Sequence, residues 1–186
     1  MKTVNIKDIR PFDIMLEGST NKLSEMIQSV INEDISHTGV FFEVIGPRGR
    51  VTYVHESKKF GIINTNFRKF YLKSKYTVYI ARLKGVMPTV QRDDKLMQFA
   101  IESAGHAGYD FMNLLIHQPI KFLWKKLTGK TIWLGRKNKK AEGRFICSER
   151  TAFIMNKFFC NEPKWWEIST DHFMNNAQYE IFKLKI

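Results

Sequence analysis

Long apolar runs are missing from this sequence of 186 residues. No stretch approaches the roughly 18 consecutive apolar residues that a membrane-spanning helix requires. The first eight residues, Met-Lys-Thr-Val-Asn-Ile-Lys-Asp, also lack the apolar segment of a secretory leader. We therefore expect a soluble protein in the cytoplasm, and delivery to another compartment by cell lysis or inside a particle remains open.

Cysteine and histidine are scarce, with two and five residues. On one helix, Cys147 and Cys160 would lie about 20 Å apart, so no disulfide is expected between them. His55 and Glu56 begin like a zinc-protease motif, but the second histidine that this motif requires is Lys59 here. The glycines form neither a phosphate-binding loop nor a dinucleotide fingerprint. No resident metal or other cofactor is expected.

Acidic residues are also few, with 18 against 30 lysines and arginines, which gives a net charge of +12. Between Lys121 and Arg144 the sequence holds nine basic residues and one acid, Glu142. The basic side chains expected to contact an anionic surface are Lys121, Lys125, Lys126, Arg136, Lys137, Lys139 and Lys140. Such a segment can attract an anionic membrane, an acidic polymer or, less expectedly, nucleic acid, and it can also be a solvated face.

Hydrophobic residues make up 44% of the sequence and include 15 Phe and 4 Trp, so we expect one packed domain over residues 1–186. Apolar periodicity predicts strands at residues 6–16, 35–45, 50–56, 75–83 and 181–186, and helices at residues 19–31, 92–103 and from 147 onward. Residues 109–127 carry a basic amphipathic helical pattern broken at Pro119. Its second half could lie on a membrane interface or pack as a core helix with its lysines reaching solvent.

Residues 46–49, Gly-Pro-Arg-Gly, predict the loop of a β-hairpin. If these four residues form the loop, Gly39 lies opposite Glu56, and His37 becomes the diagonal neighbour of Glu56 on the same face. Diagonal neighbours lie about 7 to 8 Å apart at the backbone, a gap that the two side chains can bridge. His55 falls on the other face, but a loop one residue longer or shorter would exchange it with Glu56. Which of the two orients His37 therefore depends on the turn.

Cys147 lies where an apolar approach turns into a predicted helix that Ser148 can cap and Glu149 can stabilise in its first turn. Backbone N–H groups at a helix start favour a thiolate and could hold an oxyanion. A thiol nucleophile also needs a base and a group that orients the base, and His37 and Glu56 have the required chemistry. A small buried core thiol fits the same sequence.

Four motifs together carry a family resemblance: Ser36-His-Thr-Gly-Val40, Val54-His-Glu-Ser57, Gly108-Tyr-Asp-Phe111 and Phe145-Ile-Cys-Ser-Glu149. In this order they resemble the circularly permuted, YiiX/YebB-like branch of the NlpC/P60 papain-like cysteine hydrolases, over residues 9–159. The resemblance implies an α+β, permuted papain-like fold in which a central antiparallel sheet packs against helices, including the nucleophile helix.

The resemblance also implies roles for individual residues. Cys147 would attack an amide or ester carbonyl, His37 would act as the base, and Glu56 would orient it. Ser148, Asp13, Tyr109 and Asp110 would lie at the oxyanion site or in the cleft. The family's usual Gly-Asp before the first strand reads Phe12-Asp13 here.

The expected function is that of a cysteine hydrolase that cleaves a peptide or peptidoglycan stem-peptide amide through a thioester acyl-enzyme. Peptides, cell-wall polymers or lipids are the expected substrates. One alternative is a lipid acyltransferase or thioesterase of the related permuted branch. Another is a non-catalytic basic module that binds nucleic acid or anionic lipid.

Overall fold

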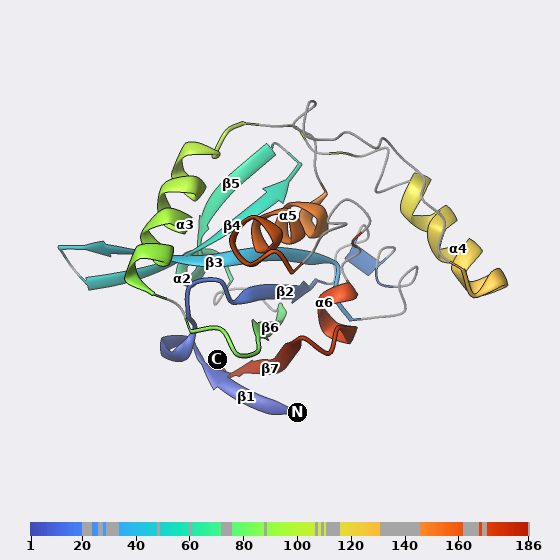
Figure 1. Ribbon diagram of the computed structural model, residues 1–186, viewed down its shortest axis with the longest axis horizontal. Helices are drawn as coiled ribbons and strands as arrows, with labels where there is room; N and C mark the ends of the chain where they lie inside the picture. The colour runs from blue at the N-terminus through green and yellow to red at the C-terminus, as the bar shows by residue number, and fades with distance from the viewer. Residues whose placement is uncertain are drawn as a thin grey trace.

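The computed structural model describes residues 1–19, 24–25, 28, 34–47, 49–59, 61–71, 76–87, 89–106, 108, 110, 116–130, 146–161, 168 and 171–185. These residues form a mixed α/β structure around a seven-stranded sheet of order β1-β7-β6-β2-β3-β4-β5 (Figure 1). The strands are β1 Lys2–Asn5, β2 Ile14–Gly18, β3 His37–Gly46, β4 Gly49–Lys58, β5 Gly61–Asn66, β6 Thr77–Leu83 and β7 Tyr179–Lys185. The helices are η1 Ile6–Asp8, α2 Phe67–Phe70, α3 Val90–Glu102, α4 Gln118–Thr128, α5 Cys147–Phe159 and α6 His172–Asn175.

The sheet is antiparallel except at one edge. Each neighbouring pair from β7 to β5 runs antiparallel, as the sequence predicts, whereas β1 pairs with β7 in parallel. Parallel neighbours need a long connection, and here that connection is nearly the whole chain. The expected central antiparallel sheet is therefore present, and the parallel pair is confined to this edge, where two strands from opposite ends of the sequence meet.

Two apolar layers cover the two faces of the sheet. On one face α3, α5 and α6 pack over the sheet (Figure 1). The buried side chains of that layer include Ile14, Leu16, Val40, Phe42, Leu96, Ala152, Ile154 and Phe173. The opposite face buries Met15, Phe41, Val54 and Ile80 with Phe67 and Tyr71. Because side chains alternate along a strand, neighbouring residues of β2 and β3 belong to different layers.

The hairpin register is as predicted. Ile45 pairs with Arg50, and Gly39 pairs with Glu56. A Cβ atom at Gly39 would lie 2.4 Å from Cγ1 of Val54 and 3.1 Å from Cβ of Glu56, so only glycine leaves room for β4 here. The register places Glu56 on the same face as His37 and His55 on the other face.

The predicted first strand, residues 6–16, is largely wrong. Residues 6–8 form η1, and β2 begins only at Ile14. Between them Phe12 has a φ of 68°, and the N–H of Asp13 donates to the carbonyl of Arg10 at 3.1 Å. This turn interrupts the extended chain, since a left-handed residue cannot continue a strand.

The other predicted elements have mixed outcomes. β6, α3 and the final strand β7 are confirmed within a few residues, whereas β5 and α2 were not predicted. The N-cap of α3 is Thr89, whose hydroxyl accepts the N–H of Arg92 at 3.3 Å. Of the predicted helix 19–31, only Ser24, Glu25 and Gln28 are described in a helix, and most of that prediction lies outside the described residues.

Pro119 does not break the helical pattern of residues 109–127, because it is the second residue of α4. Proline is tolerated in a first turn, where its missing N–H would have had no partner within the helix. Residues 109 and 111–115 lie outside the described part of the chain. Among the described residues, no helix has both the length and the apolar character needed to cross a membrane.

Candidate active site

Cys147 is the first residue of α5 and is 2% exposed. The N-cap position is Ile146, whose backbone N–H donates to the Glu149 carboxylate at 3.2 Å. Ser148 was predicted to cap the helix, but its hydroxyl donates to the carbonyl of Ile168 at 2.8 Å and is buried. The predicted Ser148 cap is therefore wrong, because this side chain points into the protein. The first turn nevertheless places Cys147 at the helix N-terminus.

The surroundings of the Cys147 thiol favour its thiolate. Burial by itself raises the pKa of the thiol, but the charge of His37 and a hydrogen bond with it act in the other direction. Backbone N–H groups of Thr38 and Ser148 also donate to the sulfur, and the net effect lowers the pKa of Cys147. The Thr38 hydroxyl lies 3.0 Å from the Thr151 hydroxyl, which fixes α5 against β3 at this point. The thiol therefore lies beside the start of β3.

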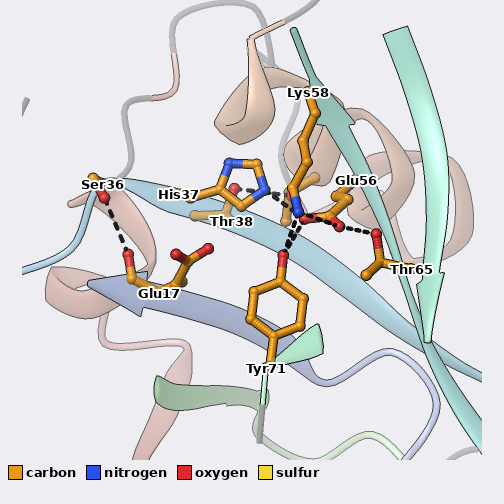
Figure 2. Close-up of polar contacts among 9 residues, drawn as sticks. Glu17, Ser36, His37, Thr38, Glu56, Lys58, Thr65 and Tyr71 are labelled. Carbon is orange, nitrogen blue, oxygen red and sulfur yellow. Dashed lines mark hydrogen bonds and ion pairs between the residues drawn. The ribbon is translucent and has the colours of Figure 1, made fainter. Parts of the chain in front are cut away.

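His37 and Glu56 form the contact that the hairpin register predicts. Nε2 of His37 lies 2.6 Å from Oε2 of Glu56, and 14% of the His37 side chain is exposed (Figure 2). Because Nε2 is engaged by Glu56, Nδ1 is the ring nitrogen left for the Cys147 thiol. Burial disfavours the imidazolium, but Cys147 and Glu56 outweigh it and raise the pKa of His37 to about 10. The lowered pKa of Cys147 and the raised pKa of His37 together favour a thiolate–imidazolium pair.

Glu56 is held by three further side chains that the sequence did not single out. The Tyr71 hydroxyl donates to its Oε2 at 2.6 Å, the Thr65 hydroxyl donates to Oε1, and Nζ of Lys58 lies 2.9 Å from Oε1. Burial would raise the pKa of Glu56, but His37, Lys58 and Thr65 together lower it to about 2. Glu56 is therefore a carboxylate, fixed on several sides (Figure 2).

Strand alternation could have indicated Lys58, which lies two residues after Glu56 on the same face of β4. Thr65 lies on β5, and it pairs with Val54 next to Glu56. Tyr71 follows α2 and reaches Glu56 only because that short helix turns the chain back under the sheet. No spacing in the sequence relates Tyr71 to Glu56.

The architecture is shared with a protein of known structure. The crystal structure of the metalloprotein YiiX from Escherichia coli O157:H7 matches with a TM-score of 0.50 at 22% sequence identity, covering 92% of this chain and 95% of YiiX. The chain has a YiiX-like fold. No protein-family model matches it, and neither does any curated protein. Similarity at this level concerns the fold and does not extend to the activity of YiiX.

The word metalloprotein describes YiiX and not this chain. Within the described ranges, no three His, Cys, Asp or Glu side chains are grouped so that they could hold a metal ion. His55 is 0% exposed on the face opposite Glu56, where its Nε2 accepts from Nη2 of Arg150 at 2.9 Å. Its Nδ1 lies 2.7 Å from Oδ1 of Asn64. Burial, together with the charge of Arg150, lowers the pKa of His55 to about 4, so this ring is neutral and does not orient His37.

Glu17 is a second buried carboxyl group near the site. It pairs with His37 across β2 and β3, and its carboxyl group points to the side of the sheet on which the His37 ring lies (Figure 2). Burial raises the pKa of Glu17, although the charges of His37 and Lys58 oppose this effect. The pKa values of the two buried carboxyl groups therefore shift in opposite directions. The pKa of Glu56 falls because His37, Lys58 and Thr65 contact it closely.

Asp13 lies in an ion pair with Arg82. Its Oδ2 is 2.7 Å from Nη2 of Arg82, and it also accepts the backbone N–H of Arg10 at 2.9 Å. Burial raises the pKa of Asp13, and Arg82 opposes this effect. Among the described contacts, none joins Asp13 to Cys147 or Glu56, and its place in the cleft remains a prediction. The turn before β2 directs this carboxylate toward β6.

The remaining predicted residues are only partly described. Asp110 is half-buried, while Tyr109 lies outside the described residues, so their place in the cleft remains a prediction. Lys126 is exposed on α4. The side chains of Lys121 and Lys125, and the whole of Arg136, Lys137, Lys139 and Lys140, lie outside the described part of the structure.

Proposed function

We propose that this chain is a cysteine hydrolase of the permuted NlpC/P60 papain-like type, which cleaves a peptide or peptidoglycan stem-peptide amide. The observation that carries the proposal is the series Cys147, His37 and Glu56. His37 lowers the pKa of the Cys147 thiol, and the Glu56 carboxylate contacts the other side of the His37 ring. A thiolate at a helix N-terminus, a histidine beside it and a buried carboxylate behind the histidine are the parts of a thiol nucleophile.

The first half of the reaction forms a thioester. The Cys147 thiolate attacks the amide carbonyl carbon, and backbone N–H groups at the start of α5 stabilise the oxyanion. Nδ1–H of His37 then protonates the nitrogen as the carbon–nitrogen bond breaks, so the amine leaves and the acyl group stays on the sulfur. Glu56 keeps the imidazole ring oriented throughout through Nε2.

The second half releases the acid. Neutral His37 accepts a proton from a water molecule, and the resulting hydroxide attacks the thioester carbonyl. The carbon–sulfur bond then breaks, which frees the carboxylic acid and restores the Cys147 thiolate with protonated His37 at Nδ1. An acceptor amine or alcohol in place of water would give acyl transfer from the same intermediate.

One observation favours the lipid alternative. Apolar side chains of α4, including Leu123 and Leu127, are exposed, and such a face suits an enzyme that acts on lipid esters at a membrane. The acyl-enzyme chemistry of Cys147 would be the same for an ester, because only the leaving group changes. A non-catalytic basic module remains the third candidate, and it predicts no role for Cys147.

Alkylation by iodoacetamide, followed at each cysteine by mass spectrometry from pH 5 to 9, tests the nucleophile. Cys160 is exposed and serves as the internal comparison for the buried Cys147. We expect Cys147 to react faster than Cys160 below pH 8 in spite of its burial, because the thiolate is the reactive form. His37→Ala should move the Cys147 profile to higher pH. Slow and equal labelling of both cysteines would contradict the proposal.

A panel of peptide-amide and ester substrates then separates the candidates. Wild type and Cys160→Ala should cleave the same compounds, while Cys147→Ala should be inactive on all of them. Preference for amides supports the hydrolase, and preference for long-chain esters supports the lipid alternative. If Cys147→Ala retains whatever activity or binding the wild type has, the catalytic proposal fails.

A further inference from the structure

Helix α4 lies apart from the apolar layers that cover the two faces of the sheet. In Figure 1 it lies at one end of the molecule, well away from α3 and α5. Within the described parts of the chain, no helix or strand packs extensively against α4. Its contribution to the core is therefore small, and the prediction that it packs as a core helix is not supported.

Five apolar side chains of residues 116–127 are exposed. They are Ile116, Ile120, Leu123, Trp124 and Leu127, whose exposures range from 42% to 74%. At 100° per residue the four of them on α4 fall within an arc of about 100°, which is the width of a helix stripe that normally faces a core, and Ile116 lies in the turn just before α4. In α3, by contrast, Leu96 and Ala100 on the corresponding stripe are fully buried. A contiguous exposed apolar stripe rimmed by polar residues is typical of a surface that binds a protein or a membrane.

The charge of the segment indicates what covers the stripe. Residues 116–130 contain four lysines and no acid, and Lys126 and Lys130 are exposed. An apolar stripe flanked by lysines complements the two chemical layers of an anionic bilayer, because acyl chains accept the stripe and lipid phosphates attract the lysines. Trp124 adds a side chain that favours the interface between these layers. At 11 residues, α4 is too short to span a bilayer, so it would lie flat in the surface.

We propose that the face formed by Ile116, Ile120, Leu123, Trp124 and Leu127 docks this protein onto anionic phospholipid membranes, with Lys126 and Lys130 contacting the lipid phosphates. Docking does not depend on the catalytic proposal, because none of these residues touches Cys147, His37 or Glu56 in the described contacts. A second copy of the chain and a nucleic acid are the other occupants that the charge and the apolar stripe allow.

Sedimentation of the full chain with vesicles tests the proposal. Wild type should sediment with phosphatidylcholine vesicles that contain phosphatidylserine and should remain in solution with phosphatidylcholine alone. Leu123→Glu should weaken binding at least tenfold, because it removes buried apolar area and adds a repelled charge. The matched control is Val90→Glu on α3, which changes a 79% exposed apolar residue in the same way and should bind within about twofold of wild type.

A second pair of variants separates lipid phosphate contacts from overall charge. Lys126→Gln with Lys130→Gln should weaken binding about 25-fold at low salt, since each lysine near an anionic surface contributes about fivefold. Lys7→Gln with Lys95→Gln changes two other exposed lysines and the same net charge, and it should bind much more tightly than the first pair. Circular dichroism of each variant checks folding. If a variant does not fold, vesicle-dependent protection of residues 116–130 from hydrogen exchange in wild type replaces it.

Several results would overturn the proposal. Wild type that does not sediment with phosphatidylserine vesicles rules it out, and so does an equal loss in Leu123→Glu and Val90→Glu. A concentration-dependent dimer that Leu123→Glu dissociates would show that a second copy covers the stripe. Binding to nucleic acid that depends on Lys126 and Lys130, with no vesicle binding, would assign the surface to that partner.

Discussion

Replacing Glu56 by glutamine tests how strongly the site depends on one buried charge. Glutamine keeps the size of the side chain and can still bond Tyr71 and Thr65, so the change removes little more than the charge. A carboxyl group whose pKa falls from 4.5 to about 2 is stabilised in its charged form by about 3 kcal/mol. His37 can lose its proton, and Lys58 can turn toward water, which limits any further cost. We therefore expect Glu56→Gln to lower the free energy of unfolding by about 3 kcal/mol near pH 6.

The pH dependence distinguishes this charge effect from a packing defect. The pKa of Glu56 is lowered, so its contribution is present above about pH 4.5 and is lost as the pH falls toward 2. The pKa of His37 is raised from 6.5 to about 10, so its contribution is present below about pH 6.5 and is lost as the pH rises through 10. The difference between wild type and Glu56→Gln should therefore be largest between about pH 4.5 and 6.5 and should narrow on both sides.

Urea unfolding at a series of pH values measures this difference, and a thermal scan should show a decrease of about 6 to 12 °C in Tm near pH 6. The control is Glu43→Gln, which changes another strand carboxylate. Burial raises the pKa of Glu43 and Arg50 opposes this effect, and among the described contacts Glu43 has none with Cys147, His37 or Glu56. The control change should leave stability near pH 6 almost unchanged. A loss for Glu56→Gln that is equal to that of the control, or that is the same at every pH, would refute the reasoning.

Three further changes test the supports of the site. Tyr71→Phe removes the hydroxyl that donates to Glu56 and should lower the free energy of unfolding in urea by about 1 to 2 kcal/mol. If adding Glu56→Gln to this variant restored its stability, the stabilising contact between Tyr71 and the Glu56 carboxylate would be contradicted. Gly39→Ala should lower the free energy of unfolding by at least about 2 kcal/mol and slow the alkylation of Cys147, because the added methyl group would collide with Val54. An unchanged alkylation rate would show that β3 and β4 move apart without disturbing the site. His55→Gln should reduce the loss of stability that wild type undergoes as the pH falls from 6.5 to about 4, since a histidine buried neutral favours unfolding when it must protonate.

The β3–β4 hairpin has the register that the sequence predicts. The turn between Gly46 and Gly49, which pair with each other at the ends of β3 and β4, sets which residues of the two strands face each other, because side chains alternate strictly along a strand. The contact of His37 with Glu56 could therefore be predicted from local sequence alone. The helix that begins at Cys147 was equally local, although its N-cap is Ile146 and the predicted Ser148 cap is wrong.

What surrounds this contact could not be predicted in the same way. Tyr71 contacts Glu56 because it follows the short helix α2, which no periodic pattern predicts. Asp13 pairs with Arg82 because Phe12, the residue before it, has a left-handed conformation. The exposure of the α4 stripe was also undecided, because an amphipathic pattern is the same whether a core or a membrane covers it.

The sequence by itself therefore determined several of the strands and helices, the hairpin register and the chemical groups that Cys147, His37 and Glu56 offer, since each depends on neighbours a few residues away. Only the tertiary structure decided which side chains hold Glu56, that β1 joins β7 in parallel, and that α4 stands clear of the core. These contacts join residues far apart in the chain. Their formation depends on how the helices pack on the sheet, and a local sequence pattern does not predict that packing.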